Sequence, residues 1–557
     1  MKTSMKKSAA LFVLWGLVGV LFAPALVWAK DPVVIDKRYR AVRLIADTPF
    51  PGVNGATIGA DGHLYLSHTG NGTITRVDLK TMKAHPFVRP YQGAFILDDL
   101  TADDRGNLYA TGTTPLVGQV YRIDKNGAPS VIAGGMAAPN GIEYNKKTGR
   151  LFVTECFQGN RIYEVDPTGQ KEARLLVDAN VIAVPEGFDF DPQTNDLIIP
   201  DLATGRILRV HPDTGAVSEL AKGVAGCIAL AIGPDKKIYV PALSGEVYRL
   251  NLDGAGLEKI AQLPPGLDNV AVAADGRLFI TSYWDATVYE VPADGKGKAR
   301  RLFETGPNQP LGLVTKGNEI WMADAIMIRK VSDKNFAPTK LNAWALHGMP
   351  LPLSLSAGPG ETLFWTDCIH NAAAVGNPAT GDFQPIAGDL GRPVASLLSA
   401  DGSALYVAEF AAGQVTAVSL KDGAKQTVAT DLQGPLALAM IGEALYVGEA
   451  KTGRVIAVDP ATGRKQILVS SLVGKPVALA HDGGGNLLVL DGAGQRLVRV
   501  NVKTRMLDEV AGNVPVSYSP IGGDPPVEFP SPMAVSAKGD IYLTTAERGL
   551  IKFEKKR

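Results

Sequence analysis

Side chains with carboxylate or amide oxygens recur in the first half of the sequence, at intervals of about forty residues. They are Asn54, Asp98 or Asp99, Asn140, Glu186 and the pair Asp268 and Asn269. A hard cation such as Ca²⁺ takes about six to eight oxygen ligands from such groups. If the fold brings these positions together, the sequence predicts a divalent metal site, with Ca²⁺ favoured, whose ligands are Asn54, Asp99, Asn140, Glu186, Asp268 and Asn269.

Three further side chains are candidates for a reaction at that site. His68 and Glu186 are the candidate catalytic residues, because histidine is the side chain best suited to transfer a proton near neutral pH and Glu186 is an acidic group of the predicted site. Trp284 could form an apolar wall that binds a substrate. Each has a simpler interpretation: His68 as a surface turn residue, Trp284 as a residue packed between structural units, and Asn or Asp before Gly as a turn former.

The elements that must position these residues are short strands. A pattern of small-apolar strand, Asp-Gly or Lys-Gly turn, Leu-Tyr-Val-like strand and Val-Tyr-Arg-Val-Asp-like strand returns about every forty residues, which is typical of propellers. Its Leu-Tyr-Val-like segments begin at His63, Asn107, Arg150, Asp196, Lys237, Arg277, Glu319, Thr362, Ala404, Ala444, Asn486 and Asp540. Twelve repeats exceed one ring of about four to eight blades. The sequence therefore predicts an all-β protein of two tandem six-bladed β-propellers, with twelve four-stranded blades.

The ends of the chain suggest how the rings divide. We expect a signal peptide at 1–29, a first propeller with the metal site at 30–295 and a second propeller at 296–557. The segment beginning at Ala41 is expected to complete the sixth blade and the segment beginning at Ala299 to complete the twelfth, with a hinge at 294–299. The signal implies a periplasmic or secreted protein, although an uncleaved membrane anchor is the alternative.

The balance of charges and the number of cysteines limit the kinds of binding partner and cross-link that the sequence predicts. Lys plus Arg and Asp plus Glu each number 56 without long blocks of one sign, so we expect no nucleic-acid partner and no membrane partner after signal cleavage. Cys156, Cys227 and Cys368 have no metal-ligand spacing and allow at most one disulfide within the chain.

Acidic residues end seven of the Leu-Tyr-Val-like strands, and this recurrence predicts a structural role in hydrogen bonding the turns. They are Glu155, Asp201, Asp324, Asp367, Glu409, Glu449 and Asp491.

The two predicted rings differ at the start of their repeats, where the second ring has mainly Pro and apolar residues. The first-ring segments Pro139-Asn140-Gly141, Pro185-Glu186-Gly187 and Asp268-Asn269-Val270 resemble motifs of the regucalcin/gluconolactonase, paraoxonase and strictosidine-synthase superfamily of six-bladed propellers. The resemblance covers about residues 41–295, and the second ring shares only a generic, NHL-type propeller repeat.

This resemblance implies a divalent metal at the ring axis that polarises an ester or lactone carbonyl and activates water. It implies that Asn140 and Asn269 match ligand asparagines and that Glu186 and Asp268 match acidic positions. The sequence departs from the pattern at Asn54, where the family hydrolases have Glu, and at Glu186, where they have Asp. The alternatives are a binding or scaffold protein, with a protein partner on the second propeller, and a lyase or strictosidine-synthase-like enzyme. The main expectation is an exported lactone or ester hydrolase that acts on a small molecule in the first channel.

Overall fold

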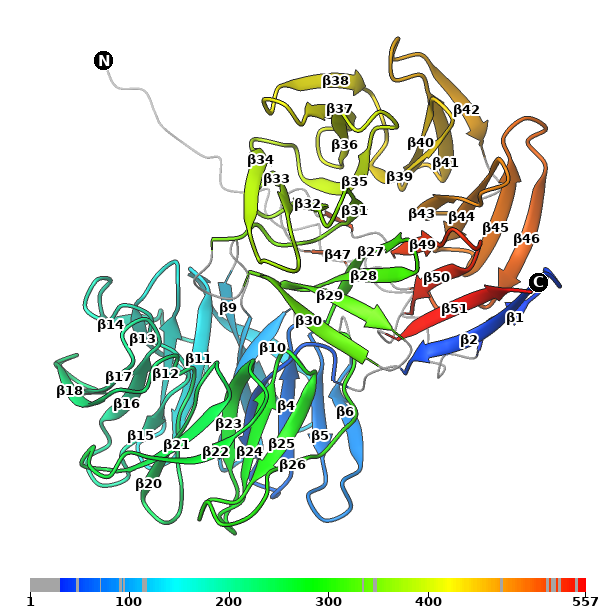
Figure 1. The fold of residues 1–557 in the computed structure, drawn as a ribbon. Helices are drawn as coiled ribbons and strands as arrows, with labels where there is room; N and C mark the ends of the chain where they lie inside the picture. The colour runs from blue at the N-terminus through cyan, green and yellow to red at the C-terminus, as the bar shows by residue number, and fades with distance from the viewer. Residues whose placement is uncertain are drawn as a thin grey trace, which may run out of the picture.

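The computed structural model describes residues 31–46, 50–70, 72–89, 93, 96–112, 118–332, 335–343, 348–470, 474–516, 520–521, 527–528, 532–545 and 549–556. Within these ranges the regular elements are strands (Figure 1). The part of the chain that the structure describes contains no helix long and apolar enough to cross a membrane. The predicted signal peptide at 1–29 lies outside the described residues.

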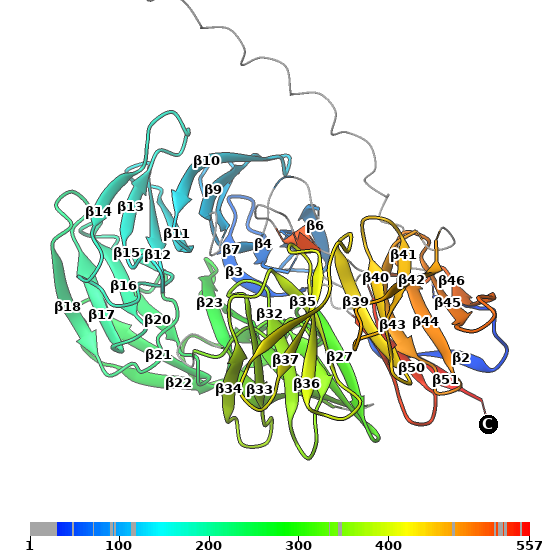
Figure 2. The same cartoon turned by 90° about the horizontal axis from the view of Figure 1, so that it is seen from above.

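The described strands form twelve large antiparallel sheets, eleven with four strands and one with five, which are the blades of two six-bladed propellers. Figures 1 and 2 show the two rings side by side. The first ring contains the strands β3 (Val53–Ile58), β4 (Leu64–His68), β5 (Ile74–Val77), β6 (Ala84–Val88), β7 (Leu97–Ala102), β8 (Leu108–Gly112), β9 (Gly118–Ile123), β10 (Pro129–Met136), β11 (Pro139–Asn145), β12 (Arg150–Glu155), β13 (Ile162–Val165), β14 (Arg174–Val177), β15 (Asp189–Phe190), β16 (Leu197–Asp201), β17 (Arg206–Val210), β18 (Val217–Lys222), β19 (Ala231–Ile232), β20 (Lys237–Pro241), β21 (Glu246–Asn251), β22 (Glu258–Gln262), β23 (Leu267–Val272), β24 (Leu278–Ser282), β25 (Thr287–Val291) and β26 (Arg300–Arg301).

The second ring begins at β27 and also takes in the two strands nearest the N-terminus. Its strands are β1 (Val33–Val34), β2 (Tyr39–Ile45), β27 (Pro310–Lys316), β28 (Glu319–Asp324), β29 (Met327–Ser332), β30 (Asn335–Asn342), β31 (Ser356–Ala357), β32 (Leu363–Asp367), β33 (Ala372–Gly376), β34 (Phe383–Ala387), β35 (Pro393–Leu398), β36 (Ala404–Glu409), β37 (Gln414–Ser419), β38 (Lys425–Ala429), β39 (Pro435–Ile441), β40 (Ala444–Glu449), β41 (Arg454–Val458), β42 (Lys465–Val469), β43 (Pro476–His481), β44 (Asn486–Asp491), β45 (Arg496–Asn501), β46 (Leu507–Gly512), β49 (Met533–Val535), β50 (Ile541–Thr544) and β51 (Leu550–Lys555). A separate hairpin pairs β47 (Pro520–Ile521) with β48 (Val527–Glu528).

The all-β prediction and the repeat are confirmed. Each of the twelve Leu-Tyr-Val-like segments lies in the second strand of a blade, where the apolar residues are buried between neighbouring sheets. Outer strands such as β6 consist mainly of exposed and half-buried residues instead, because the outer edge of the blade meets solvent. In the first ring the innermost strand of the last blade, β23, contacts that of the first blade, β3, and in the second ring β49 contacts β27.

The predicted exchange of outer strands between the rings is wrong. The strand that begins near Ala299, β26, pairs with β25 in its own blade, and the predicted hinge at 294–299 is the turn between them. The N-terminal strand β2 pairs with β51 and completes the last blade, while β1 adds a fifth strand beside β46 (Figure 1). The strands therefore divide between the rings differently from the predicted boundaries 30–295 and 296–557. A short hairpin costs less closure entropy than a distant pairing, which favours β26 in its own blade.

A buried arginine joins the two rings. Arg329 of β29 has no exposed surface, and its Nε donates a hydrogen bond of 2.6 Å to Asp324 Oδ2 in the same blade. Its Nη2 donates to the backbone carbonyl of Trp284 in the first ring. Asn308, which is also fully buried, donates from Nδ2 to the carbonyl of Tyr283. Charge-assisted bonds of this kind are strong and directional, so they hold the last blade of the first ring against the second ring.

Candidate functional site

Five oxygen-bearing side chains occupy equivalent places at the start of the inner strands of the first ring. In each blade the axial residue follows the residue that pairs with the end of the second strand, as Asn140 follows Pro139, the partner of Glu155. The same rule places an apolar residue, Ile228, in blade five. The six axial residues are Asn54, Asp98, Asn140, Glu186, Ile228 and Asp268.

Local irregularity of the inner strands accompanies the axial residues. The ladders of β3, β7, β11 and β23 each shift register at the axial residue and its successor. Such β-bulges re-aim a side chain that a regular strand would direct onto one face of the sheet. The bulges therefore explain how Asn54, Asp98, Asn140 and Asp268 can leave the ordinary strand alternation.

Hydroxyl groups of the second strands fix the axial backbone. Thr154 Oγ1 donates to the carbonyl of Glu186 in the next blade at 3.4 Å. Ser67, Thr111 and Thr281 donate in the same way to the carbonyls of Asp98, Asn140 and Asn54. Each bond joins one blade to its neighbour, so the axial residues are positioned by the closed ring and not by single loops.

Glycines after the axial residues allow the inner strands to approach closely. A Cβ on Gly141 would lie 2.7 Å from the carbonyl oxygen of Glu186, and a Cβ on Gly187 would lie 2.7 Å from Asn269 Oδ1. Real Cβ atoms do not approach oxygen this closely. The Gly in the Asn-Gly and Glu-Gly pairs is therefore needed for blade contact, which goes beyond turn formation.

The axial carboxyl groups are buried and repel one another. Glu186 is 1 % exposed, and burial, followed by the charges of Asp268 and Asp98, raises the pKa of its carboxyl well above the usual value. Burial and the charge of Asp98 also raise the pKa of Asp268. Glu186 Oε1 is buried without a hydrogen-bond partner among the described residues. A carboxyl oxygen in this state is suited to hold either a proton or a cation.

Asparagines of the first and last blades of the ring hydrogen-bond each other in the axial cluster. Asn269 Nδ2 donates to Asn54 Oδ1 at 2.9 Å and to Asp268 Oδ1 at 3.3 Å. Asn140 hydrogen-bonds the thiol of Cys156, and burial followed by the charge of Glu186 raises the pKa of that thiol. Cys156, Cys227 and Cys368 are all free and buried, so no disulfide constrains the site.

Asp99 does not take the axial place that the sequence analysis gave it. Asp98 is the axial residue of blade two, and Asp99 lies one residue further along β7. Its Oδ1 accepts from the backbone N–H of Leu100 at 2.8 Å, and its Oδ2 accepts from Ile142 N–H at 3.2 Å. The carboxyl caps backbone groups that the bulges leave without a ladder partner, and burial raises its pKa to about 8.

His68 lies in the core and not at the channel mouth. It is fully buried, its ring stacks on Phe50 with centroids 5.9 Å apart, and its Nε2 bonds the hydroxyl of Thr75 at 2.8 Å. Burial alone lowers the pKa of His68 to about 3, so the ring is neutral at physiological pH. This position does not fit the predicted role of a general base, because β4 directs the ring between strands.

The seven acidic residues that end second strands have the predicted structural role. Asp201 Oδ1 accepts the N–H of Val184, and Asp491 Oδ1 accepts that of Lys475, so each carboxylate binds the segment that leads into its own blade. The other five accept comparable backbone bonds, from residues 137, 309, 351, 391 and 433. They belong to the framework and leave the axial groups as the candidate reactive ones.

The ring interface lies next to the axial cluster and includes a residue that the sequence analysis missed. Trp284 packs over Gly266, where a Cβ would lie 2.1 Å from the indole Cγ, and its carbonyl accepts the bond from Arg329. Tyr283 hydrogen-bonds Thr69, and burial, then Asp324 and Asp268, raises the pKa of its phenol. Tyr283 thus stands between an acid of the second ring and the axial acids. Its place directly after a second strand, as with Cys156, is the signal that could have identified it.

The donor set fits a hard cation in part. Within the described ranges no group of three or more His, Cys, Asp or Glu residues is compact enough to hold a metal ion. A cation would therefore need amide oxygens from Asn54 and Asn140 in addition to the carboxyl of Glu186, whose Oε1 is unpartnered. Carboxylates and amides are the oxygen donors that Ca²⁺ accepts, and a cation would offset the repulsion among the buried acids.

Comparison with known proteins supports the resemblance inferred from the motifs. The chain is 26 % identical over 171 residues to a gluconolactonase of Zymomonas mobilis, covering 26 % of this chain and 48 % of that protein. It is 26 % identical over 125 residues to protein strictosidine synthase-like 12 of Arabidopsis thaliana, covering 19 % of this chain and 37 % of that protein. The chain is similar to gluconolactonase and strictosidine-synthase-like proteins. It spans about half or less of the length of these relatives.

Two solved structures complete the comparison. A gluconolactonase from Xanthomonas campestris matches with 15 % identity and a TM-score of 0.38, covering 47 % of this chain and 94 % of that one. A chain of a nidogen/laminin complex matches with 17 % identity and a TM-score of 0.33, covering 48 % of this chain and 90 % of the other. No protein-family model matches the sequence.

Proposed function

We propose that this protein is an exported, metal-dependent hydrolase of the lactonase or esterase type, which acts on a small molecule at the axial cluster of the first ring. The observation that carries the proposal is Glu186 Oε1, a fully buried acceptor without a partner among the described residues and beside other acids. Similarity to a gluconolactonase supports the reaction class. The charged and apolar start of the sequence, Met1–Ala29, supports export.

The residues divide the chemistry as follows. Asn54, Asn140 and Glu186 would hold the divalent ion, with Ca²⁺ favoured by the oxygen donors. When bound, such an ion supplies Lewis-acid polarisation of an ester or lactone carbonyl and a more acidic water. Burial, followed by the charge of Asp98, raises the pKa of Asp268, which makes its carboxylate a stronger base that would take the proton from the attacking water. Ile228 closes the ring of axial residues with an apolar side chain and excludes water from that side.

The second ring has a supporting role in this proposal. Arg329 and Asn308 fasten the backbone of Tyr283 and Trp284, which lie beside the axial acids. A scaffold that fixes the last blade of the first ring keeps Asp268 and Asn269 in register with Asn54. Catalytic groups need such fixed positions, because displacements of about 1 Å cost large factors in rate.

The test begins with the metal content of the purified protein and its hydrolysis of glucono-δ-lactone and phenyl acetate, before and after chelation with EGTA. We expect roughly one divalent ion per chain and chelator-sensitive hydrolysis. Glu186→Gln should lose the ion and at least about 100-fold in kcat/KM. Glu143→Gln, a carboxyl further along β11 than Asn140, is the matched control and should keep both. Absence of an ion together with an unchanged melting curve after EGTA would refute the metallohydrolase proposal.

A further inference from the structure

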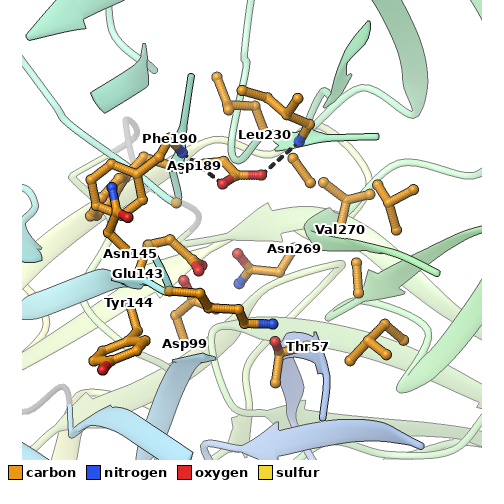
Figure 3. Close-up of a pocket in the computed structure, with 18 of the residues that line it drawn as sticks. Thr57, Asp99, Glu143, Tyr144, Asn145, Asp189, Phe190, Leu230, Asn269 and Val270 are labelled. Carbon is orange, nitrogen blue, oxygen red and sulfur yellow. Dashed lines mark hydrogen bonds between the residues drawn. The ribbon is translucent and has the colours of Figure 1, made fainter. Parts of the chain in front are cut away.

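A cavity of about 350 Å³ lies in the first ring, beside residues that follow the axial ones along the inner strands (Figure 3). The later residues of the inner strands line it, together with the turns that follow them. Asp99, Glu143 and Asp189 face it from β7, β11 and β15, and Asn269 faces it from β23 (Figure 3). Cavities of a few hundred Å³ with a few convergent polar groups are typical of small-molecule sites.

Hydrogen-bond acceptors exceed donors in this cavity. Asp189 accepts the N–H groups of Phe190 at 2.6 Å and Ile232 at 2.7 Å. Glu143 Oε1 accepts from Thr101 Oγ1 at 2.8 Å, whereas its Oε2 accepts nothing from the described residues. Carboxylate oxygens can accept further bonds from a donor in the cavity.

Asn269 is an independent observation that points to a ligand. Its side chain is only 6 % exposed, and both of its hydrogen bonds are donated by Nδ2. No described residue donates to Oδ1, and the amide points into the cavity in Figure 3. An amide oxygen that opens onto the cavity can accept a hydrogen bond from a donor placed there.

The charges in the cavity are incompletely balanced. Burial, followed by the charge of Asp189, raises the pKa of Glu143, and burial raises the pKa of Asp189 to about 6. Lys146, on the turn after β11, lowers the pKa of both carboxyls but is itself exposed. Two exposed lysines, Lys146 and Lys147, line the cavity together with four carboxyl groups, those of Asp99, Glu143, Asp189 and Asp191, so the carboxyl groups outnumber the lysines.

We propose that this cavity binds a small organic cation through a primary ammonium group. Three N–H donors on one cationic nitrogen match the carboxyls of Glu143 and Asp189 and the free amide oxygen of Asn269. The carbon portion would lie against Tyr144 and Phe190, which also line the cavity. The ammonium group of the ligand would neutralise the carboxylate charges that Lys146 now offsets only in part. The two carboxyl groups of this site, Glu143 and Asp189, are not among the residues proposed to hold the metal ion, so the two proposals can be tested separately.

Isothermal titration of the full-length protein with putrescine tests the proposal, with 1,4-butanediol as the uncharged analogue. Putrescine should bind, and the diol should not. Glu143→Gln and Asp189→Asn should each weaken putrescine at least about tenfold, because a charge-assisted bond is lost. Lys146→Ala should instead tighten binding roughly two- to fivefold by removing a competing cation, and Lys125→Ala, an exposed lysine of blade two, should change nothing.

The Lys146→Ala arm keeps the test decisive even if a carboxyl variant fails to fold, since Lys146 is exposed. Glu186→Gln should retain putrescine binding, which separates this site from the axial cluster. The proposal is overturned if the diol binds as well as putrescine, if Lys146→Ala weakens binding, or if binding depends on Glu186 and not on Glu143.

Discussion

The side chain of Asn269 donates a 2.9 Å hydrogen bond to that of Asn54, although 215 residues separate them in sequence. The bond joins the last blade of the first ring to the first blade at the axis itself. It is accompanied by a bond from Thr281 to the Asn54 carbonyl, so closure of the ring and assembly of the axial cluster are one event.

Asn269→Ala should therefore lower both stability and metal affinity. Loss of the bond and of the buried amide should reduce the free energy of unfolding by about 1–2 kcal/mol, measured by urea denaturation. Asn126→Ala, at an exposed turn of blade two, is the control and should stay within about 0.5 kcal/mol of wild type. Equal stability of the two variants would mean that the Asn269 bond contributes nothing to closure.

The buried acids predict how stability depends on pH without metal. The pKa of Asp99 is raised from 3.8 to about 8 by burial, and that of Glu186 is raised as well, so the folded state binds more protons than the unfolded chain. Unfolding free energy must then fall as pH rises from about 4 to about 8. We expect the melting temperature in EGTA to drop by at least about 3 °C over this interval in a thermal melt. A flat or rising profile would contradict the burial of these groups.

Glu186→Gln should raise the melting temperature of the metal-free protein at pH 8, because the substitution removes a carboxylate that is costly to ionise. Glu164→Gln provides the opposite control. Glu164 accepts bonds from Arg150 and Arg174, and the Arg150 bond in particular lowers its pKa, so this substitution should lower or leave unchanged the melting temperature. Calorimetry of both variants in EGTA would distinguish the two behaviours.

Arg329→Met should uncouple the rings. The substitution leaves Asp324 buried without its partner and the Trp284 carbonyl without its donor, at a cost of about 3 kcal/mol or more. In chemical denaturation, we expect the unfolding transitions of the two rings to be further apart in the variant than in the wild type. The fluorescence of Trp284 should also change. Arg454→Met breaks a pair between a partly exposed arginine and the buried Glu449 within one blade of the second ring, and this control should leave the coupling of the rings intact.

Removal of residues 1–46 should open the second ring and spare the first. β51 would lose β2, its only partner on that side, and amide exchange in 550–555 should accelerate by about 100-fold or more. Removal of 1–31 leaves β2 in place and is the control. Hydrogen exchange followed by mass spectrometry would show the difference, and acceleration in β3 or β23 instead would contradict the strand assignment.

The repeat was predictable from sequence because the second strand of each blade contains the same short run of buried, mostly apolar residues, as at Leu64–His68 and Ala444–Glu449. The outer strands were not, since Ala41–Ile45 and Ala299–Phe303 are both short apolar segments with arginines, and local pattern cannot say which distant edge each one joins. Only the pairing of β2 with β51 decides it.

The site was predictable to the level of the axial position but not of the side-chain direction. Asp98 and Asp99 are adjacent identical residues, and the bulge in β7 determines which one faces the axis. His68 shows a related difficulty: its place at the end of β4 is shared with acids that bind turns, but the ring turns inward onto Phe50. Tyr283 was missed because its importance depends on Asp324, which belongs to the other ring.

The pairing of β2 with β51 also has a consequence for biosynthesis. β2 leaves the ribosome before all strands of the first ring, and its partner β51 leaves after them and after the other strands of the second ring. At about 5–20 residues per second, β2 would wait on the order of 25–100 s for β51. During that interval the first ring has all its own strands and can close, whereas the second cannot. The order of synthesis therefore favours a finished first propeller before the second one closes by pairing β51 with β2.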